Sequence, residues 1–251
     1  MIIMTNRPFP EAQKHGPLEA LFDDVYFVTG GMRMARPPLS FSRNMTVLRN
    51  DDALTLVNSV RLNDSGLAEL DKLGQVENVV RLAGFHGTDD PFYKDRYGAT
   101  VWAIEDQLYV SGFEQAEERA YFQPDQFISD SSHLPVPGAR LYRFGSAKPG
   151  EGLLLLERDG GILIAGDCLQ NWQRTDQYFS LIARLMMPLK GFIKPHNIGP
   201  GWLQAVKPDP DELRGLLTLD FEHVLPAHGS PVIGGARDKY RDTIQRVATN
   251  L

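Results

Sequence analysis

Gly84-Phe85-His86-Gly87-Thr88-Asp89-Asp90-Pro91-Phe92-Tyr93 directly follows the apolar run Val79-Val80-Arg81-Leu82. Two later segments, 164–168 (IAGDC) and 224–229 (VLPAHG), repeat this pattern, in which an apolar run ends in a short loop that carries Asp or His. Side chains just past a strand are held rigidly at the rim of a sheet. The three segments therefore predict one shared site that contains His86, Asp90, Asp167 and His228.

Apolar runs and turn residues predict a mixed α/β fold. Strands are expected at 25–28, 45–48, 54–57, 76–82, 101–104, 108–110, 141–144, 153–156 and 162–165. One helix is expected from a cap at Asp64 or Ser65 to Gly74. Others are expected at 92–97, at 179–187 before Pro188, after Asp209, and at 236–247.

The order and rough spacing of the three loops resemble the metallo-β-lactamase fold superfamily, from about Val25 to about His228. That family has H-x-H-x-D-H after one strand, a lone His after another, Gly-Asp after a third and a late His after a fourth. The resemblance implies a four-layer αββα sandwich in a single domain over residues 1–251, with residues 1–20 as a peripheral N-terminal extension.

The resemblance also implies a metal site. In that family two metal ions, about 3.5 Å apart, activate a bridging water for hydrolysis. His86 matches the first His of the motif, Asp90 matches its Asp, Asp167 matches the bridging Asp and His228 matches the late His. These four residues are the expected metal ligands.

Three His of the family pattern are missing. Thr88 and Pro91 stand where two of them are expected, and Ser146 is the nearest equivalent of the lone His. The first ion would keep only two protein ligands, whereas catalytic zinc normally has three. The second ion would keep two carboxylates and one imidazole, a set that can hold Zn, Fe or Mn. We therefore expect one divalent metal ion, or none.

A metal-free interpretation is also open. Asp90-Pro91 is typical of a helix start, with Asp90 as the N-cap, Pro91 in the first turn and Gly98 at the end. Asp167 would then cap the turn after its strand, and His228 would be a buried His bonded to a neighbouring loop.

Several further residues are candidates for the site. Asp89 could act as a base beside His86 and Asp90. Thr88, Tyr93 and Ser146 are expected to line the pocket. His196 lies in a Gly/Pro-rich loop and could supply a replacement ligand or line the pocket. No organic cofactor is expected, because no Gly-rich phosphate loop follows a strand.

Composition limits the partners. The fractions of hydrophobic residues (42%) and of charged residues (23%) are typical of a globular protein. A formal net charge of −6 argues against a nucleic-acid partner.

No run of about 18 apolar residues occurs, so no membrane partner is expected. Cys168 is the only cysteine and no signal peptide is recognisable, which favours the cytoplasm. Oligomeric state cannot be predicted.

Two functions remain after this reasoning. The first is an atypical hydrolase of a small ester, lactone, amide or thioester, in which Asp90, Asp167 and His228 hold one ion and His86 orients or protonates the water or leaving group. The alternative is a metal-free, non-catalytic relative that binds a small ligand or a protein partner. A diiron oxidoreductase would need more ligands than the chain offers.

Overall fold

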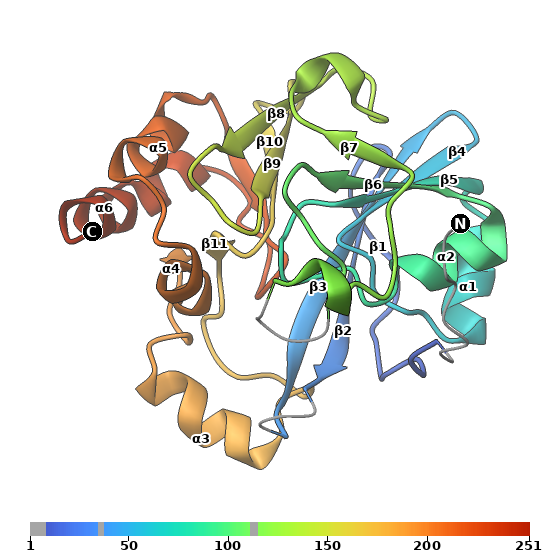
Figure 1. The fold of residues 1–251 in the computed structure, drawn as a ribbon, viewed down its shortest axis with the longest axis horizontal. Coiled ribbons are helices and arrows are strands. Elements are labelled where there is room, and N and C mark those ends of the chain that lie inside the picture. Colours follow the sequence, from blue (N-terminus) through green and yellow to red (C-terminus); the bar gives the residue numbers. More distant parts are fainter. Residues whose placement is uncertain (1–8, 35–37, 111–114) are drawn as a thin grey trace.

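The computed structural model describes residues 9–34, 38–110 and 115–251, which form two large sheets with helices on their outer faces (Figure 1). The larger sheet contains, in spatial order, β1 (Glu19–Phe22), β2 (Val25–Arg33), β3 (Ser40–Asn50), β4 (Ala53–Val57), β5 (Gln75–Arg81), β6 (Thr100–Ile104) and β7 (Gln126–Ile128). Neighbours from β1 to β4 are antiparallel, and neighbours from β4 to β7 are parallel.

The smaller sheet has the order β13 (His223–Leu225), β10 (Ile162–Ala165), β9 (Glu151–Leu156) and β8 (Ala139–Phe144). Strands β10 and β13 run parallel, so their carboxyl ends meet at one edge of the sheet. A separate two-stranded ribbon pairs β11 (Leu169–Gln170) with β12 (Asn197–Ile198).

Six α-helices lie in the described part of the chain: α1 (Asp64–Asp71), α2 (Asp90–Tyr97), α3 (Leu181–Leu189), α4 (Pro200–Val206), α5 (Pro210–Gly215) and α6 (Ala236–Thr249). Short 3-10 helices occupy Glu117–Arg119, Ser131–His133 and Leu216–Thr218. Helix α1 begins where the Asn63 side chain accepts a hydrogen bond from the amide of Gly66, and α2 ends at Gly98 in the left-handed conformation.

The buried side chains confirm the four layers. Between the sheets, Phe27, Val80 and Ile104 pack against Leu154 and Ile164. The outer face of the larger sheet is covered by α1 and α2, through Leu67, Leu70 and Tyr93 among others. That of the smaller sheet is covered by α4, α5 and α6, through Trp202, Leu213 and Tyr240 among others. Each fully buried side chain of this size contributes about 1.5–3 kcal/mol relative to exposure. The chain is therefore an αββα sandwich, as expected.

Most predicted elements are confirmed, and three details were wrong. Residues 108–110 form no strand, because Tyr109 makes only an isolated bridge to Phe122. Helix α1 is capped by Asn63, not by Asp64 or Ser65. Helix α3 contains Pro188, where the prediction ended it.

Glu19 and Ala20, at the end of the predicted N-terminal extension over residues 1–20, pair with β2 at the edge of the larger sheet. Residues 1–8 lie outside the described residues. Within the described residues, no helix has the length and apolar character needed to cross a bilayer.

Candidate metal centre

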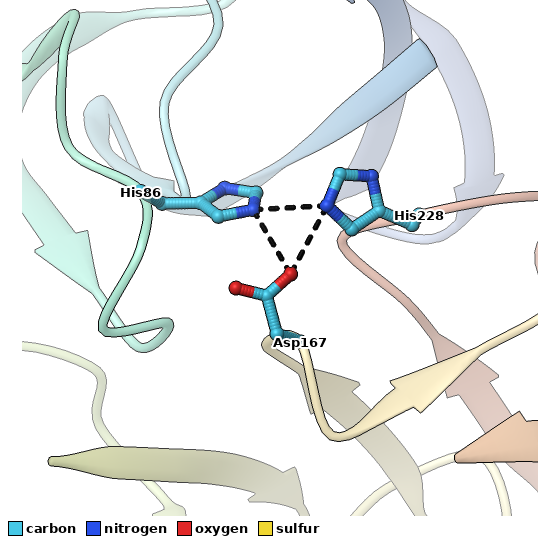
Figure 2. Close-up of side chains that lie close together, drawn as sticks. All are labelled: His86, Asp167 and His228. Atoms are coloured by element: carbon cyan, nitrogen blue, oxygen red, sulfur yellow. Dashed lines mark hydrogen bonds and ion pairs between the residues drawn. The ribbon is translucent and has the colours of Figure 1, made fainter. Parts of the chain in front are cut away.

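Three loops bring His86, Asp167 and His228 together at one edge of the sandwich (Figure 2). The loops follow β5, β10 and β13. Oδ1 of Asp167 lies 3.0 Å from Nε2 of His228 and 3.4 Å from Nε2 of His86, and the two Nε2 atoms are 3.2 Å apart. All three side chains are buried, with at most 8% of each residue exposed. Three potential ligand atoms thus converge on one small volume.

The orientation of His228 leaves its Nε2 lone pair free for the site. Nδ1 of His228 lies 2.9 Å from the carbonyl oxygen of Ser42. Because a carbonyl oxygen can only accept, Nδ1 carries the proton and donates it in this hydrogen bond. Nε2 of neutral His228 is therefore unprotonated and points at His86 and Asp167. An outer hydrogen bond of this kind is typical of histidines that bind metals.

Charge in the cluster is concentrated on Asp167. Burial alone would raise the pKa of Asp167, but the two imidazoles hold it well below its ordinary value. Burial lowers the pKa of His86, against the opposite effect of Asp167. The favoured state is an ionised carboxylate beside a neutral His86, which is the form in which both groups bind a metal ion.

Two polar atoms of the cluster have no hydrogen-bond partner among the described residues. They are Nδ1 of His86 and Oδ2 of Asp167, and both are buried. Buried polar atoms of this kind are rare and costly, so each of them calls for an explanation. A species bound among the three side chains would supply a partner for Oδ2 of Asp167, whereas Nδ1 of His86 points away from Asp167 and His228 (Figure 2).

Aromatic side chains form one wall of the site. The ring of His228 lies 4.8 Å from the ring of Trp172 and 5.8 Å from that of Phe41, measured between centroids. Trp172 is fixed by a hydrogen bond of 2.9 Å from its Nε1 to Oγ of Ser42. Two aromatic rings therefore pack beside the imidazole of His228.

Comparison with solved structures identifies the fold of the chain. No profile of a known family matches the chain, and no curated protein matches it in sequence. VMB-1 superposes with a TM-score of 0.66 at 14% identity, covering 96% of this chain and 99% of that one. The DIM-1 metallo-beta-lactamase superposes with a TM-score of 0.64 at 13% identity, covering 94% and 99%. The chain has the metallo-β-lactamase fold.

A third structure with this fold was solved with zinc. The metallo-beta-lactamase FIM-1 from Pseudomonas aeruginosa, solved in a mono-zinc form, superposes with a TM-score of 0.57 at 12% identity, covering 96% of this chain and 99% of that one. Identities this low establish the fold alone. The ligands of this chain therefore have to be judged from its own side chains.

Asp90 lies outside the cluster that the other three expected ligands, His86, Asp167 and His228, form. Its side chain is fully buried, and its two oxygens accept hydrogen bonds of 2.6 Å from the hydroxyls of Ser59 and Tyr109. Burial raises the pKa of Asp90. Asp90 is not part of the three-residue cluster. It is also not the N-cap of α2, since that position belongs to Asp89.

Asp89 is held in an ion pair and is not a free base. Its carboxylate accepts hydrogen bonds from the guanidinium of Arg43 and, at 2.6 Å, from the amide of Arg61. The residue is only 1% exposed. A carboxylate that is already neutralised by a buried arginine is poorly suited to abstract a proton.

The other pocket candidates lie outside the cluster. Tyr93 is fully buried in the core under α2, where its hydroxyl donates to the carbonyl oxygen of Val60 at 2.6 Å. Ser146 is exposed, and its Oγ accepts from the amide of Asp209 at 2.8 Å. His196 packs its ring against Tyr240 on α6, with 5.5 Å between centroids. Thr88 is exposed, and its side chain hydrogen-bonds the hydroxyl of Tyr121.

Glu151 joins the loops of His86 and Asp167, and the sequence analysis missed it. This residue at the start of β9 is fully buried, and its carboxyl oxygens accept from the amides of Gly84 at 3.2 Å and Cys168 at 2.9 Å. Burial and the charge of Asp167 raise the pKa of Glu151 well above its ordinary value. The only sequence signal is a charged residue that opens the otherwise apolar strand 151–156.

Asn58 forms a second link beneath the site. Its Oδ1 accepts from the amide of Leu82 at 3.0 Å, and its Nδ2 donates to the carbonyl oxygen of Ala165 at 3.2 Å. The side chain therefore ties the end of β4 to the ends of β5 and β10. Asn58 adopts a positive φ of 54°, which Asn tolerates better than most residues.

The three-residue cluster fits a divalent metal ion. Two imidazoles and one carboxylate are the protein ligands of several catalytic zinc sites and of mononuclear iron sites. Ligands about 2.1 Å from one ion, at angles between tetrahedral and octahedral, lie roughly 3.0–3.4 Å from each other. The observed separations of 3.0, 3.2 and 3.4 Å fall in that range. Oδ2 of Asp167, a buried oxygen without a hydrogen-bond partner among the described residues, belongs to the same cluster.

Proposed function

We propose that this protein is a hydrolase that holds one divalent metal ion, Zn, Fe or Mn, with His86, Asp167 and His228. Its substrate would be a small ester, lactone, amide or thioester. The observation that carries the proposal is the convergence of two imidazole nitrogens and one carboxylate oxygen within 4.8 Å of one another in a buried position. The mono-zinc form of FIM-1 adds support, since one ion suffices to occupy a site in this fold.

The ligand roles differ from those in the sequence-based hypothesis. His86 replaces Asp90 as the third ligand, because the oxygens of Asp90 are occupied by Ser59 and Tyr109. When bound, the ion would act as a Lewis acid and lower the pKa of a water molecule. Three protein ligands leave positions open for water and substrate.

Each protein group has a separate task in this proposal. Asp167 supplies the negative charge that offsets the ion. The carbonyl oxygen of Ser42 holds His228 in the tautomer whose Nε2 can bind. The wall of Phe41 and Trp172 favours an apolar portion of the substrate next to His228.

The partner would be a small molecule rather than nucleic acid, since the chain carries a formal net charge of −6. The single cysteine, buried Cys168, supports a cytoplasmic location.

Elemental analysis tests the proposal. Protein is expressed with supplemented Zn, Fe and Mn, purified without chelator and analysed by plasma mass spectrometry. We expect close to one equivalent of a single metal in the unchanged protein, and a large loss in the variants Asp167→Asn and His228→Ala. Asp90→Asn is the matched control, because it removes a buried carboxylate beside the site and should keep its metal. Background metal in the unchanged protein would refute the proposal.

The second candidate is a metal-free protein that binds a small ligand or a protein partner. The observation that favours it is the direct contact among the three side chains, since Oδ1 of Asp167 already lies 3.0 Å from Nε2 of His228. Melting with and without a chelator separates the two candidates. A ligand that binds only the folded state raises the melting temperature, so a drop of several degrees with chelator supports the metal site.

A further inference from the structure

One face of α3 exposes an unusual amount of apolar surface. Leu181, Leu185 and Leu189 are 85%, 70% and 82% exposed, and they recur every four residues along one side of the helix. Ile182 and Met186, which are 50% and 36% exposed, widen the same side. We call these five residues the α3 apolar face. Contiguous exposed apolar surface of this kind marks a contact with a protein or a membrane.

The opposite side of α3 is firmly packed. Ala183 and Met187 are buried with Phe179 and Trp172 in a cluster of their own. The helix begins with Ser180, whose side chain accepts a hydrogen bond from the amide of Ala183 at 3.3 Å. In Figure 1, α3 lies at the lower edge of the molecule, beside the end of β3, where Ser180 and Ser40 exchange hydrogen bonds. The exposed leucines therefore belong to an anchored helix that projects outward.

Positive charge surrounds the α3 apolar face. Residues 177–208 contain Arg184, Lys190, Lys194 and Lys207 and no acidic residue, although the whole chain has a net charge of −6. At about 100° per residue, Arg184 lies roughly 60° from the leucines on one side, and Lys190 lies roughly 40° beyond Met186 on the other. The exposed leucines are thus bordered by a basic residue on each side.

We propose that the α3 apolar face binds the surface of an anionic lipid bilayer. Leucines on one face with basic residues at the borders are typical of helices that lie in the plane of the membrane interface. The leucines would enter the acyl boundary, while Arg184, Lys190 and Lys194 would contact anionic headgroups. A second copy of the chain fits less well, because a symmetric contact would bring the same basic residues together.

The sequence-based expectation of no membrane partner considered only segments that cross a bilayer. A helix that lies on the surface needs no run of 18 apolar residues, and α3 has nine residues. The proposal is independent of the metal centre. The test of membrane binding therefore gives its result whether or not the protein is a hydrolase.

Vesicle flotation tests the proposal. The purified full chain is mixed with vesicles of pure phosphatidylcholine or of phosphatidylcholine with phosphatidylglycerol, and the bound fraction is measured. We expect binding to the anionic vesicles, and weaker binding to the neutral ones. Raising the salt from about 0.1 M to about 1 M should reduce binding severalfold, because the Debye length falls from about 10 Å to about 3 Å.

Two sets of variants locate the contact. Replacing Leu181, Leu185 and Leu189 together by serine should reduce the partition coefficient at least about tenfold, and K190E with K194E should do the same for anionic vesicles. I233S and K72E are matched controls, since Ile233 is 51% exposed and Lys72 is exposed, both outside α3. Circular dichroism should show an unchanged fold in all variants.

Three results would overturn the proposal. One is no binding of the unchanged protein to anionic vesicles. Another is equal binding by the triple serine variant and I233S. The third is a dimer in light scattering that the serine substitutions dissociate, without vesicle binding, which would make the α3 apolar face an interface between copies.

Discussion

Nδ1 of His228 lies 2.9 Å from the carbonyl oxygen of Ser42, which is on β3 of the larger sheet, whereas His228 follows β13 of the smaller one. This hydrogen bond crosses between the sheets and fixes the imidazole tautomer. The pairing of the sheets therefore has a direct chemical consequence, because it leaves Nε2 of His228 available to a metal ion.

The first prediction concerns His228 as a ligand. His228→Ala should weaken metal affinity about 100-fold or more, since it removes one of only three protein ligands. Competition of the protein with a chromogenic chelator measures the affinity. His196→Ala is the matched control, because His196 packs on Tyr240 away from the cluster. Equal losses in both variants would contradict the assignment.

The strand-end pattern predicted a shared site of four residues, and three of them lie together in the structure. The four-layer fold followed only from the resemblance to the metallo-β-lactamase superfamily, since the pattern alone predicts no more than a mixed α/β fold. His86, Asp167 and His228 lie two to five residues past the ends of β5, β10 and β13, so the sequence placed them at the rim of a sheet. Local patterns sufficed there, because the position after a strand determines where the side chain emerges.

Asp90 could not be resolved in the same way. Whether its carboxylate faces the site depends on the hydroxyls of Ser59 and Tyr109, which come from two other loops. Glu151 was missed for a related reason, since its partners are backbone amides, which leave no trace in the sequence. The α3 apolar face was predicted only as an apolar helix, because exposure depends on what packs nearby.

The second prediction concerns the structural role of Asp90. Asp90→Ala should lower the free energy of unfolding by about 2–4 kcal/mol, because it leaves the hydroxyls of Ser59 and Tyr109 without their acceptor and opens a small cavity. Urea unfolding of the metal-free protein measures this change. Metal stoichiometry should stay the same in the folded variant. A stable variant that has lost its metal would instead make Asp90 a ligand.

The third prediction concerns pH and His86. Burial lowers the pKa of His86 from its ordinary 6.5, so the folded protein keeps this imidazole neutral while the unfolded chain takes up a proton. The stability that His86 contributes is therefore present above pH 6.5, and it is lost as the pH falls through the lower pKa of the folded state. The melting temperature of the metal-free protein should fall relative to that of His86→Gln as the pH is lowered from 7.5 to 5, which lie on either side of the ordinary pKa of 6.5.

Carboxyl groups do not mimic this effect. The lowered pKa of Asp167 acts in the same direction but below its ordinary value of 3.8, at lower pH. The raised pKa values of Asp90 and Glu151 act in the opposite direction, and both groups are present in the two proteins compared. A difference in melting temperature that is constant over the pH range would show that His86 takes up its proton equally in both states.

The last prediction concerns Glu151, whose two carboxyl oxygens accept from the amides of Gly84 and Cys168. Whether or not it carries a proton, each oxygen has a lone pair that can accept. Glu151→Gln replaces one of them by an amide group that cannot accept. One buried amide then loses its partner, which should cost about 1–3 kcal/mol in the free energy of unfolding.

Metal affinity should fall in the same variant by about tenfold or more, because the loops of His86 and Asp167 lose their common support. Denaturant unfolding and chelator competition measure the two effects. Glu157→Gln is the control on the same chain segment, since Glu157 is exposed and forms an ion pair with exposed Arg140 at 3.0 Å. Such surface pairs contribute about 0–1 kcal/mol, so both properties should change little. A Glu151→Gln protein that is less stable but binds metal as before would show that Glu151 contributes only to packing. A decrease in both the free energy of unfolding and the metal affinity would show that Glu151 positions His86 and Asp167.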